Sequence, residues 1–235
     1  MNLSQRQRQP EWMDQPDLDP QLHAAALRGL ERIHRCAGTV RRLFGPIAEF
    51  ASRQPAQPMK VLDIACGGGA VSVGLAKLAE KHQIRLQIDG CDLSDEALAF
   101  AKQRSQKAGV SVNFFRADVL SVALPTGYDC MVSSLFFHHL DDQDVVALLS
   151  SMQLAEPKLI VVSDLLRSRV GYALAWTACR VLTTSRVCRF DGPVSVQGSF
   201  SLDEILALAH RSGLNSARIR KCWPEQWLLT WGAES

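Results

Sequence analysis

The stretch from Val61 to Ala70, V-L-D-I-A-C-G-G-G-A, decides the fold of this 235-residue chain. Its apolar start predicts a buried strand, and the glycines at positions 67, 68 and 69 predict a tight turn. A helix after the turn is indicated by apolar residues at positions 71, 73, 75 and 78. Such a glycine turn lets the backbone approach a ligand, and the first amides of the helix face that ligand. The stretch therefore predicts one half of a nucleotide-binding site.

The composition limits the size and class of the protein. With 47% hydrophobic and 21% charged residues, the chain is long enough for one sizeable α/β domain with a shorter appendage. A net charge of +2 argues against a dedicated nucleic-acid binder. Seven scattered cysteines without a C-x-x-C pair or a zinc-ligand spacing predict neither a disulfide framework nor a metal site. Without a signal segment or an apolar run of transmembrane length, we expect a cytoplasmic protein.

The first quarter of the chain is expected to be helical after a polar start. Residues 1–16 lack periodicity and predict a mobile leader. Asp19 and Pro20 form a helix start, and apolar residues then recur at spacings of three and four as far as Phe44. Gly38 is expected to separate two helices. Residues 17–58 are therefore predicted to form a helical cap, ending in a proline-containing linker, that packs on the domain formed by residues 59–235.

Strands and helices are expected to alternate after the glycine turn. Further apolar strands are predicted at 84–88, 110–115, 129–135 and from 159, which calls for a parallel sheet buried on both faces. Ligands of such sheets bind at the carboxyl ends of the strands, where Asp92, Asp118 and residues 134–139 fall. Asp92 follows Gly69 by 23 positions, the distance at which nucleotide-binding units present an acid to ribose.

The alternation breaks between residues 167 and 200. Residues 170–182 predict an apolar helix, and the following polar stretch with Gly192 and Pro193 predicts a loop. Because this insertion follows the fifth strand, we expect it to form a lid over the ligand edge. The capping box that begins at Ser201 predicts a last helix to about Arg211. Residues 217–222 and 226–231 predict a terminal hairpin.

The glycine turn alone leaves the cofactor open, because it fits an altered dinucleotide fingerprint and an altered D-x-G-x-G-x-G motif equally well. Three features favour the second interpretation. Asp63 lies inside the first strand, where a nicotinamide enzyme usually has apolar residues. Asp118 supplies an acid suited to an adenine amino group. The chain also finishes in a hairpin, where a dinucleotide fold would need more βαβ units.

Four motifs now carry a family resemblance over residues 60–165: V-L-D-I-A-C-G-G-G, G-C-D-L-S, F-F-R-A-D-V and Y-D-C-M-V-S-S-L-F-F-H-H-L. In this order and spacing they resemble the class I S-adenosylmethionine-dependent methyltransferases, particularly the ubiquinone/menaquinone C-methyltransferase-like group. The resemblance implies an α/β, Rossmann-like sheet of seven strands, mostly parallel with a terminal antiparallel hairpin and flanked by helices. It also implies S-adenosylmethionine as the cofactor.

The resemblance assigns roles to the residues at the ends of the strands. The turn that begins at Ala65 would hold the methionine portion and the adenosine, and we expect an ordinary backbone conformation at Ala65. Asp92 would bind the ribose hydroxyls. The remaining cofactor residues are Asp63, which would order the turn, Cys66, Gly67, Gly69, Leu93 against the adenine, Asp118 at its amino group, the Val119 amide, and Ser133 or Ser134 beside the methionine amino group. Helix or turn capping remains the alternative role for Asp92 and Asp118.

The acceptor and the catalytic group are less constrained by the sequence. His138 or His139 is the candidate general base, but adjacent residues of an extended chain cannot both point into one site. Apolar residues of the lid favour a small phenol- or quinol-like acceptor, lipid-like or carrier-bound, although the same residues also suit packing. An NAD(P)-dependent oxidoreductase and a non-catalytic cofactor-binding module remain alternatives. Whether carbon, oxygen or nitrogen is methylated, and whether the protein forms a homodimer, stays open.

Overall fold

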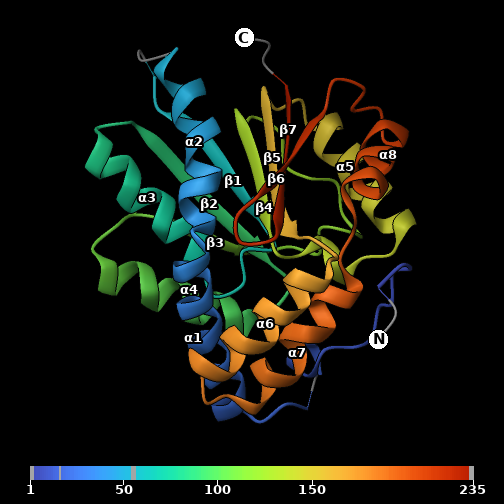
Figure 1. Cartoon of the computed structure of the whole chain (residues 1–235). Helices are drawn as coiled ribbons and strands as arrows, with labels where there is room; N and C mark the ends of the chain where they lie inside the picture. Colours follow the sequence, from blue (N-terminus) through green and yellow to red (C-terminus); the bar gives the residue numbers. More distant parts are fainter. Residues whose placement is uncertain (1–2, 16, 54–56, 233–235) are drawn as a thin grey trace.

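The computed structural model describes residues 3–15, 17–53 and 57–232, and its centre is one seven-stranded sheet (Figure 1). The strand order is β3-β2-β1-β4-β5-β7-β6. The first five strands pair in parallel, and β7 is antiparallel to both β5 and β6. The strands are β1 (Met59–Ile64), β2 (Leu86–Asp92), β3 (Asn113–Arg116), β4 (Cys130–Ser134), β5 (Leu159–Leu165), β6 (Arg218–Cys222) and β7 (Gln226–Gly232). The predicted Rossmann-like sheet and its terminal hairpin are thus confirmed.

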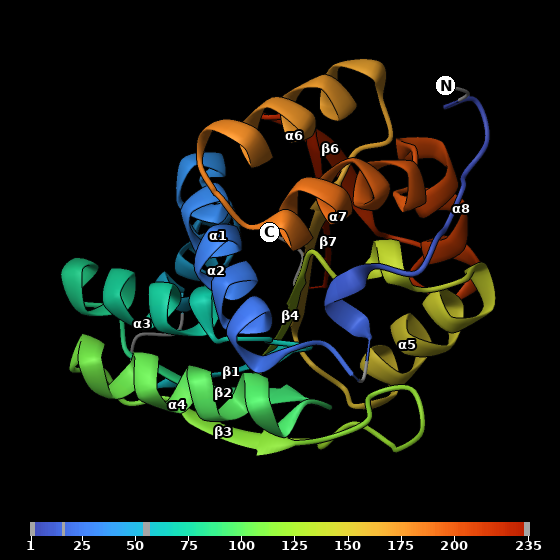
Figure 2. The ribbon, with the colours of Figure 1, turned by 90° about the horizontal axis from the view of Figure 1, so that it is seen from below.

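Helices cover both faces of the sheet and its carboxyl edge. One face packs against α2 (Thr39–Ser52), α3 (Ala70–His82) and α4 (Asp95–Ala108), around Leu43, Leu75 and Leu98. The other face packs against α5 (Asp142–Leu154) and α8 (Leu202–Arg211). The view from below shows α1 (Pro20–Ala37), α6 (Arg169–Val181) and α7 (Arg186–Gly198) together at the carboxyl edge of the sheet (Figure 2). Two 3₁₀ turns, η1 (Trp12–Asp14) and η2 (Phe137–His139), complete the elements.

The two N-terminal helices begin and separate where the sequence predicts. Asp19 accepts hydrogen bonds from the amides of Gln21 and Leu22, at 2.8 and 3.1 Å, and α1 starts at Pro20. Gly38 has a left-handed backbone (φ 68°) between α1 and α2. Its conformation suits glycine because a Cβ atom at this φ would be strained against the residue's own backbone. In the described part of the chain, no helix has both the length and the apolar character needed to cross a bilayer.

The predicted loop around Gly192 and Pro193 is instead helix α7, which corrects the sequence-based expectation. Pro193 cannot donate the amide hydrogen bond that the Arg189 carbonyl would accept in an uninterrupted helix. The helix forms because Val187 and Val196 are buried, and because α7 packs along α6 and α1. Packing against segments distant in sequence outweighs the local preference of Gly192 and Pro193 for a loop. A search for periodicity detects such packing poorly.

The capping box of α8 is present and supports the first prediction. The Ser201 hydroxyl accepts from the Glu204 amide at 3.3 Å, and the Ser201 amide donates to the Glu204 carboxylate at 2.8 Å. We expect Ser201→Ala to lower the free energy of unfolding by about 1 kcal/mol in urea denaturation, because one amide of the first turn loses its acceptor. Ser216→Ala, at an exposed position, is the matched control and should leave the unfolding midpoint unchanged. Equal midpoints for the two variants would contradict the capping role.

Candidate functional site

The glycine turn between β1 and α3 has a left-handed backbone at three positions. Ala65, Gly67 and Gly69 have φ angles of 54°, 51° and 70°. The expected ordinary conformation at Ala65 is therefore wrong. A left-handed alanine costs roughly 1–2 kcal/mol. The turn is nevertheless held, because the Cys66 amide donates to the Cys91 carbonyl at 2.9 Å and the Gly69 amide donates to the Cys66 carbonyl at 2.9 Å.

The space beside the turn differs between its glycines. A Cβ atom added to Gly67 would meet nothing within 4 Å, whereas one added to Gly69 would lie 2.8 Å from the Cβ of Ala101. Gly69 is thus required for packing against α4, and Gly67 borders open space. The Cys66 side chain is half-buried, and burial raises the pKa of its thiol, so it stays protonated at neutral pH. The open side of the turn at Gly67 is where a ligand can approach the backbone.

Asp63 lies in β1 directly behind the turn and is completely buried. One carboxylate oxygen accepts from the Ser72 hydroxyl of α3, while the other has no hydrogen-bond partner among the described residues. Burial raises the pKa of Asp63 to about 7. A buried oxygen without a partner is costly. This residue connects β1 to α3, in agreement with a role in ordering the turn.

Asp92, at the end of β2, joins that strand to the glycine turn. Its carboxylate accepts from the Gly67 amide at 2.7 Å and from the Ser94 amide at 2.9 Å. The structure thus brings Asp92 and the turn together, as the spacing predicts. The next side chain, Leu93, is 54% exposed although it is apolar. An exposed leucine beside an acid at this edge offers an apolar surface on which an aromatic ring can pack.

Asp118 and Val119 follow β3 and have different environments. The Asp118 carboxylate accepts from the Ser121 hydroxyl at 2.7 Å and from the Leu120 amide at 3.2 Å, and these hydrogen bonds lower its pKa. In this structure Asp118 therefore caps a turn, which is the alternative considered for it. The side chain of Val119 is buried in the core. The Ala117 amide donates to the Asp92 carbonyl at 3.0 Å, which ties this strand end to the candidate site.

Ser133 and Ser134 form the end of β4. Ser133 is buried, and its hydroxyl donates to the Ile64 carbonyl of β1 at 3.0 Å, so this side chain joins two strands. Ser134 is half-buried. Leu135 follows with a left-handed φ of 52°, and its amide donates to the Ser163 carbonyl. The chain leaves β4 through a sharp change of direction that leads directly into η2.

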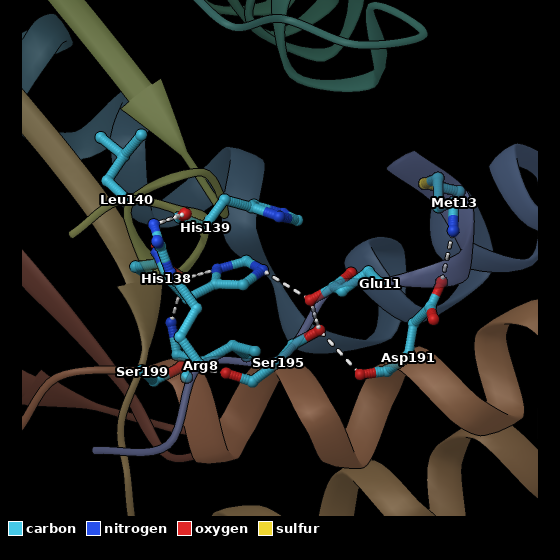
Figure 3. A network of polar contacts seen from close by, with 12 residues as sticks. Arg8, Glu11, Met13, His138, His139, Leu140, Asp191, Ser195 and Ser199 are labelled. Carbon is cyan, nitrogen blue, oxygen red and sulfur yellow. Dashed lines mark hydrogen bonds and ion pairs between the residues drawn. The ribbon is translucent and has the colours of Figure 1, made fainter. Parts of the chain in front are cut away.

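His138 lies in η2, and its ring is held between the carboxylates of Asp164 and Glu11 (Figure 3). Its Nδ1 lies 2.8 Å from an Asp164 oxygen, and its amide donates to the other Asp164 oxygen at 3.0 Å. Its Nε2 lies 3.5 Å from a Glu11 oxygen. The His139 ring lies 4.2 Å from the His138 ring, between centroids. The two histidines share one side of the chain because the backbone forms a 3₁₀ turn there, so the geometry of an extended strand does not apply.

The described part of the predicted mobile leader, residues 3–15, packs over this corner (Figures 2 and 3). Arg6 donates to the carbonyls of His138, Leu140 and Gly198, and Arg8 donates to the His139 carbonyl at 2.7 Å. These acceptors lie more than 130 positions along the chain, so no local pattern reveals the contacts. Residues 3–15 thus pack against the site through specific hydrogen bonds, whereas their polar sequence predicts a mobile leader.

Further contacts anchor the same segment to α7. The amides of Trp12 and Met13 donate to the Asp191 carboxylate at 2.8 and 3.1 Å, and the Ser195 hydroxyl donates to Glu11 at 2.6 Å. Glu11 and Asp191 are both buried. The insertion 167–200 thus contacts η2 directly and is also joined to it through the N-terminal segment. Its predicted role as a lid stays a prediction.

Helix α1 lies over the glycine turn from the other side. Arg104 of α4 donates to the Gly68 carbonyl and pairs with Glu31 of α1 at 2.8 Å. His23 of α1 lies 3.2 Å from Glu96 of α4. Of the two N-terminal helices, α1 thus packs at the ligand edge, whereas α2 packs on one face of the sheet.

Comparison with known sequences identifies residues 61–155 as a match to a family model described as a methyltransferase domain. The ubiquinone biosynthesis O-methyltransferase of Colwellia psychrerythraea is 31% identical over 126 residues, which are 53% of this chain and 49% of that protein. The release factor glutamine methyltransferase of Enterococcus faecalis is 29% identical over 160 residues, 66% and 53% of the two chains. The matches thus span about half the length of these curated relatives.

Solved structures with a similar fold extend over more of the chain. The plantazolicin methyltransferase BpumL, in complex with SAH and a triazolic analogue, superimposes with a TM-score of 0.68 at 16% identity and covers 91% of this chain and 90% of its own. The magnesium protoporphyrin IX methyltransferase of Synechocystis, with bound SAH, gives a TM-score of 0.58 at 15% identity, covering 83% and 84%. At these identities the likeness establishes the fold.

Proposed function

We propose that this chain, whose residues 61–155 match a methyltransferase domain, is a class I S-adenosylmethionine-dependent methyltransferase that transfers the methyl group of S-adenosylmethionine to a small, apolar or aromatic acceptor. The observation that carries the proposal is the hydrogen bond between the Gly67 amide and the Asp92 carboxylate, at 2.7 Å. It joins Asp92 to the glycine turn at a position that borders open space. The acid and the turn come from different strands and meet at the carboxyl edge, where ligands of parallel sheets bind. S-adenosylmethionine supplies an activated methyl group on a sulfonium.

The residues present fit this cofactor. Gly67 leaves room for it, and the buried Asp63 oxygen without a partner makes the turn polar from below. Asp92 would accept from the two ribose hydroxyls, and the exposed Leu93 would pack on the adenine. Ala65, Cys66 and Gly69 would shape the backbone around the methionine and adenosine portions.

The rest of the cofactor site is assigned by position. Asp118 would accept from the adenine amino group, which requires it to give up part of its present bonding to Leu120 and Ser121. The Val119 amide would serve a ring nitrogen. A backbone carbonyl of Ser133 or Ser134 would lie beside the methionine amino group, since Ser133 uses its hydroxyl on Ile64.

Methyl transfer from a sulfonium is an in-line displacement, so alignment of acceptor and methyl supplies much of the catalysis. The general base predicted at His138 or His139 stays a prediction. Asp164 and Glu11 face the two ring nitrogens of His138. A base role for His138 would therefore need its Nε2 to turn from Glu11 toward the acceptor.

A phenol- or quinol-like acceptor is the class we infer. Supporting it, the relative from Colwellia psychrerythraea is named a ubiquinone biosynthesis O-methyltransferase. The lid helix α6 also carries exposed apolar side chains, Val170, Trp176 and Val181. An aromatic acceptor would be received by this apolar surface.

Two alternatives are distinguishable from this proposal. A nicotinamide-dependent reductase would need a catalytic set such as Tyr-x-x-x-Lys. Tyr128 donates to Asp89 at 2.6 Å instead, and neither Tyr128 nor Tyr172 is followed by lysine four positions later. A non-catalytic module would bind the cofactor without turnover.

Isothermal titration with S-adenosylhomocysteine and with NADH tests the cofactor. We expect S-adenosylhomocysteine to bind with one site per chain and NADH not to bind, because the assigned residues serve an adenosine and a methionine portion and none is assigned to a nicotinamide. Transfer of label from S-adenosylmethionine to a panel of phenols, quinols and amines then tests the acceptor. Binding of NADH alone would contradict the methyltransferase proposal, and binding without transfer to any acceptor would favour the non-catalytic module.

A further inference from the structure

We propose that Glu11, His138 and His139 form a binding site for a divalent transition-metal ion. One ligand atom from each of the three residues lies within 4.8 Å of the other two. Glu11 and His138 are buried, and His139 is half-buried. Glu11 belongs to the N-terminal segment and the histidines to η2, so the site exists only while that segment lies over the sheet edge (Figure 3).

The separation between the ligand atoms suits a shared ion. Nε2 of His138 and the Glu11 oxygen are 3.5 Å apart, beyond the 2.7–3.2 Å of an ordinary N–H···O hydrogen bond. Zinc binds imidazole nitrogen and carboxylate oxygen at about 2.0–2.2 Å, so neighbouring ligands of a tetrahedral ion are about 3.4 Å apart. A ligand atom of His139 lies within 4.8 Å of the other two, and its half-buried position allows the side chain to move closer and complete the set.

Outer contacts hold the ligands in the orientation that a metal needs. Histidine ligands usually bind a carboxylate through the nitrogen that does not face the metal, and Asp164 does this to His138 Nδ1 at 2.8 Å. Asp164 is buried and makes two further hydrogen bonds with backbone amides, of His138 and Leu165. The Ser195 hydroxyl donates to the Glu11 oxygen at 2.6 Å, which fixes the carboxylate.

The charges around the corner are compatible with a cation. Glu11, Asp164 and Asp191 are buried carboxylates from three separate segments. Arg6 and Arg8 direct guanidinium hydrogens to backbone carbonyls of residues 138–140 and 198. Arg6 also lies 3.4 Å from Asp142 and against the Phe200 ring.

Two imidazoles and one carboxylate select the type of ion. Nitrogen ligands favour zinc, iron, cobalt or nickel over magnesium and calcium, which prefer oxygen. In a four-coordinate site the three side chains leave one position for water or for an oxygen of the acceptor, and only this last step rests on the proposed function. A histidine bound through Nε2 is not available as a general base, so the two roles exclude each other.

Zinc titration of the full-length, chelator-treated protein tests the site, with magnesium as the parallel probe. We expect one zinc per chain and no magnesium binding. Glu11→Gln and His139→Gln should each weaken zinc binding at least about tenfold, the lower limit for losing even an outer contact. Glu80→Gln on α3 and His210→Gln on α8 make the same changes at exposed positions and should leave the affinity unchanged.

Cobalt(II) substitution distinguishes this site from cysteine ligation. We expect visible absorption of a four- or five-coordinate ion without a thiolate charge-transfer band. The proposal is overturned if no stoichiometric zinc binds, if Glu11→Gln binds zinc like the wild type, or if the band is present. S-adenosylhomocysteine binding, measured on the same preparations, separates the two proposals: its retention with loss of zinc binding in Glu11→Gln supports the metal site alone. A variant that lost both would be misfolded, and the metal readout would then come from His139→Gln.

Discussion

Asp92→Asn is expected to weaken the binding of S-adenosylhomocysteine by roughly one to two decades, corresponding to about 1–3 kcal/mol. The wild-type carboxylate has two acceptor oxygens, which now serve the Gly67 and Ser94 amides at 2.7 and 2.9 Å. An asparagine keeps one acceptor but loses the charge and turns an amino group toward a donor. The ribose and the glycine turn would then compete for a single acceptor oxygen.

Isothermal titration of wild type and variant at one salt concentration measures this effect. Asp89→Asn is the matched control, because Asp89 lies on the same strand, and its carboxylate accepts from the Tyr128 hydroxyl at 2.6 Å. Its affinity should match the wild type, although its stability falls. Equal affinities for wild type and Asp92→Asn would contradict the assigned role of Asp92, and an equal loss in both variants would point to a general effect on folding.

The sheet and the Asp92 corner could be predicted because their signals are local and repeated. Continuous apolar strands, the glycines after β1 and the acid at the end of β2 can each be recognised from a few neighbouring residues. Parallel topology then brings the strand ends to one edge without further information. The capping box at Ser201 and the break at Gly38 are predictable for the same reason: one residue and its immediate neighbours determine the backbone there.

The N-terminal segment and α7 could not be predicted, because their stability comes from distant partners. Glu11 meets Ser195 and His138, and the Trp12 amide meets Asp191, across more than 120 positions of sequence. Such contacts leave no periodicity in a polar stretch. One signal was present for Asp164: an acid inside the apolar run L-I-V-V-S-D-L is costly to bury unless it is bonded, and His138 is its partner.

Asp63→Asn is expected to change how stability depends on pH. Burial raises the pKa of Asp63 from 3.8 to about 7. Between these values the unfolded chain has lost the proton that the folded protein keeps, so the free energy of unfolding falls as the pH rises. The stabilising contribution is complete below about pH 4 and lost above about pH 7. With 1.36 kcal/mol for each pKa unit, the whole change is on the order of 4 kcal/mol.

Asparagine has nearly the same shape, can still accept from the Ser72 hydroxyl and does not ionise. In urea unfolding at pH 5, 6, 7 and 8, we therefore expect the variant to become progressively more stable relative to the wild type as the pH rises. Asp129→Asn is the control, because the pKa of Asp129 is shifted in the opposite direction. Hydrogen bonds from Lys158, at 2.8 Å, and from the Lys60 amide lower that pKa. Its contribution is lost only as the pH falls below the ordinary aspartate range. Parallel curves for wild type and Asp63→Asn would mean that the buried carboxyl is ionised in the folded protein, with a cation or water at the oxygen beneath the glycine turn.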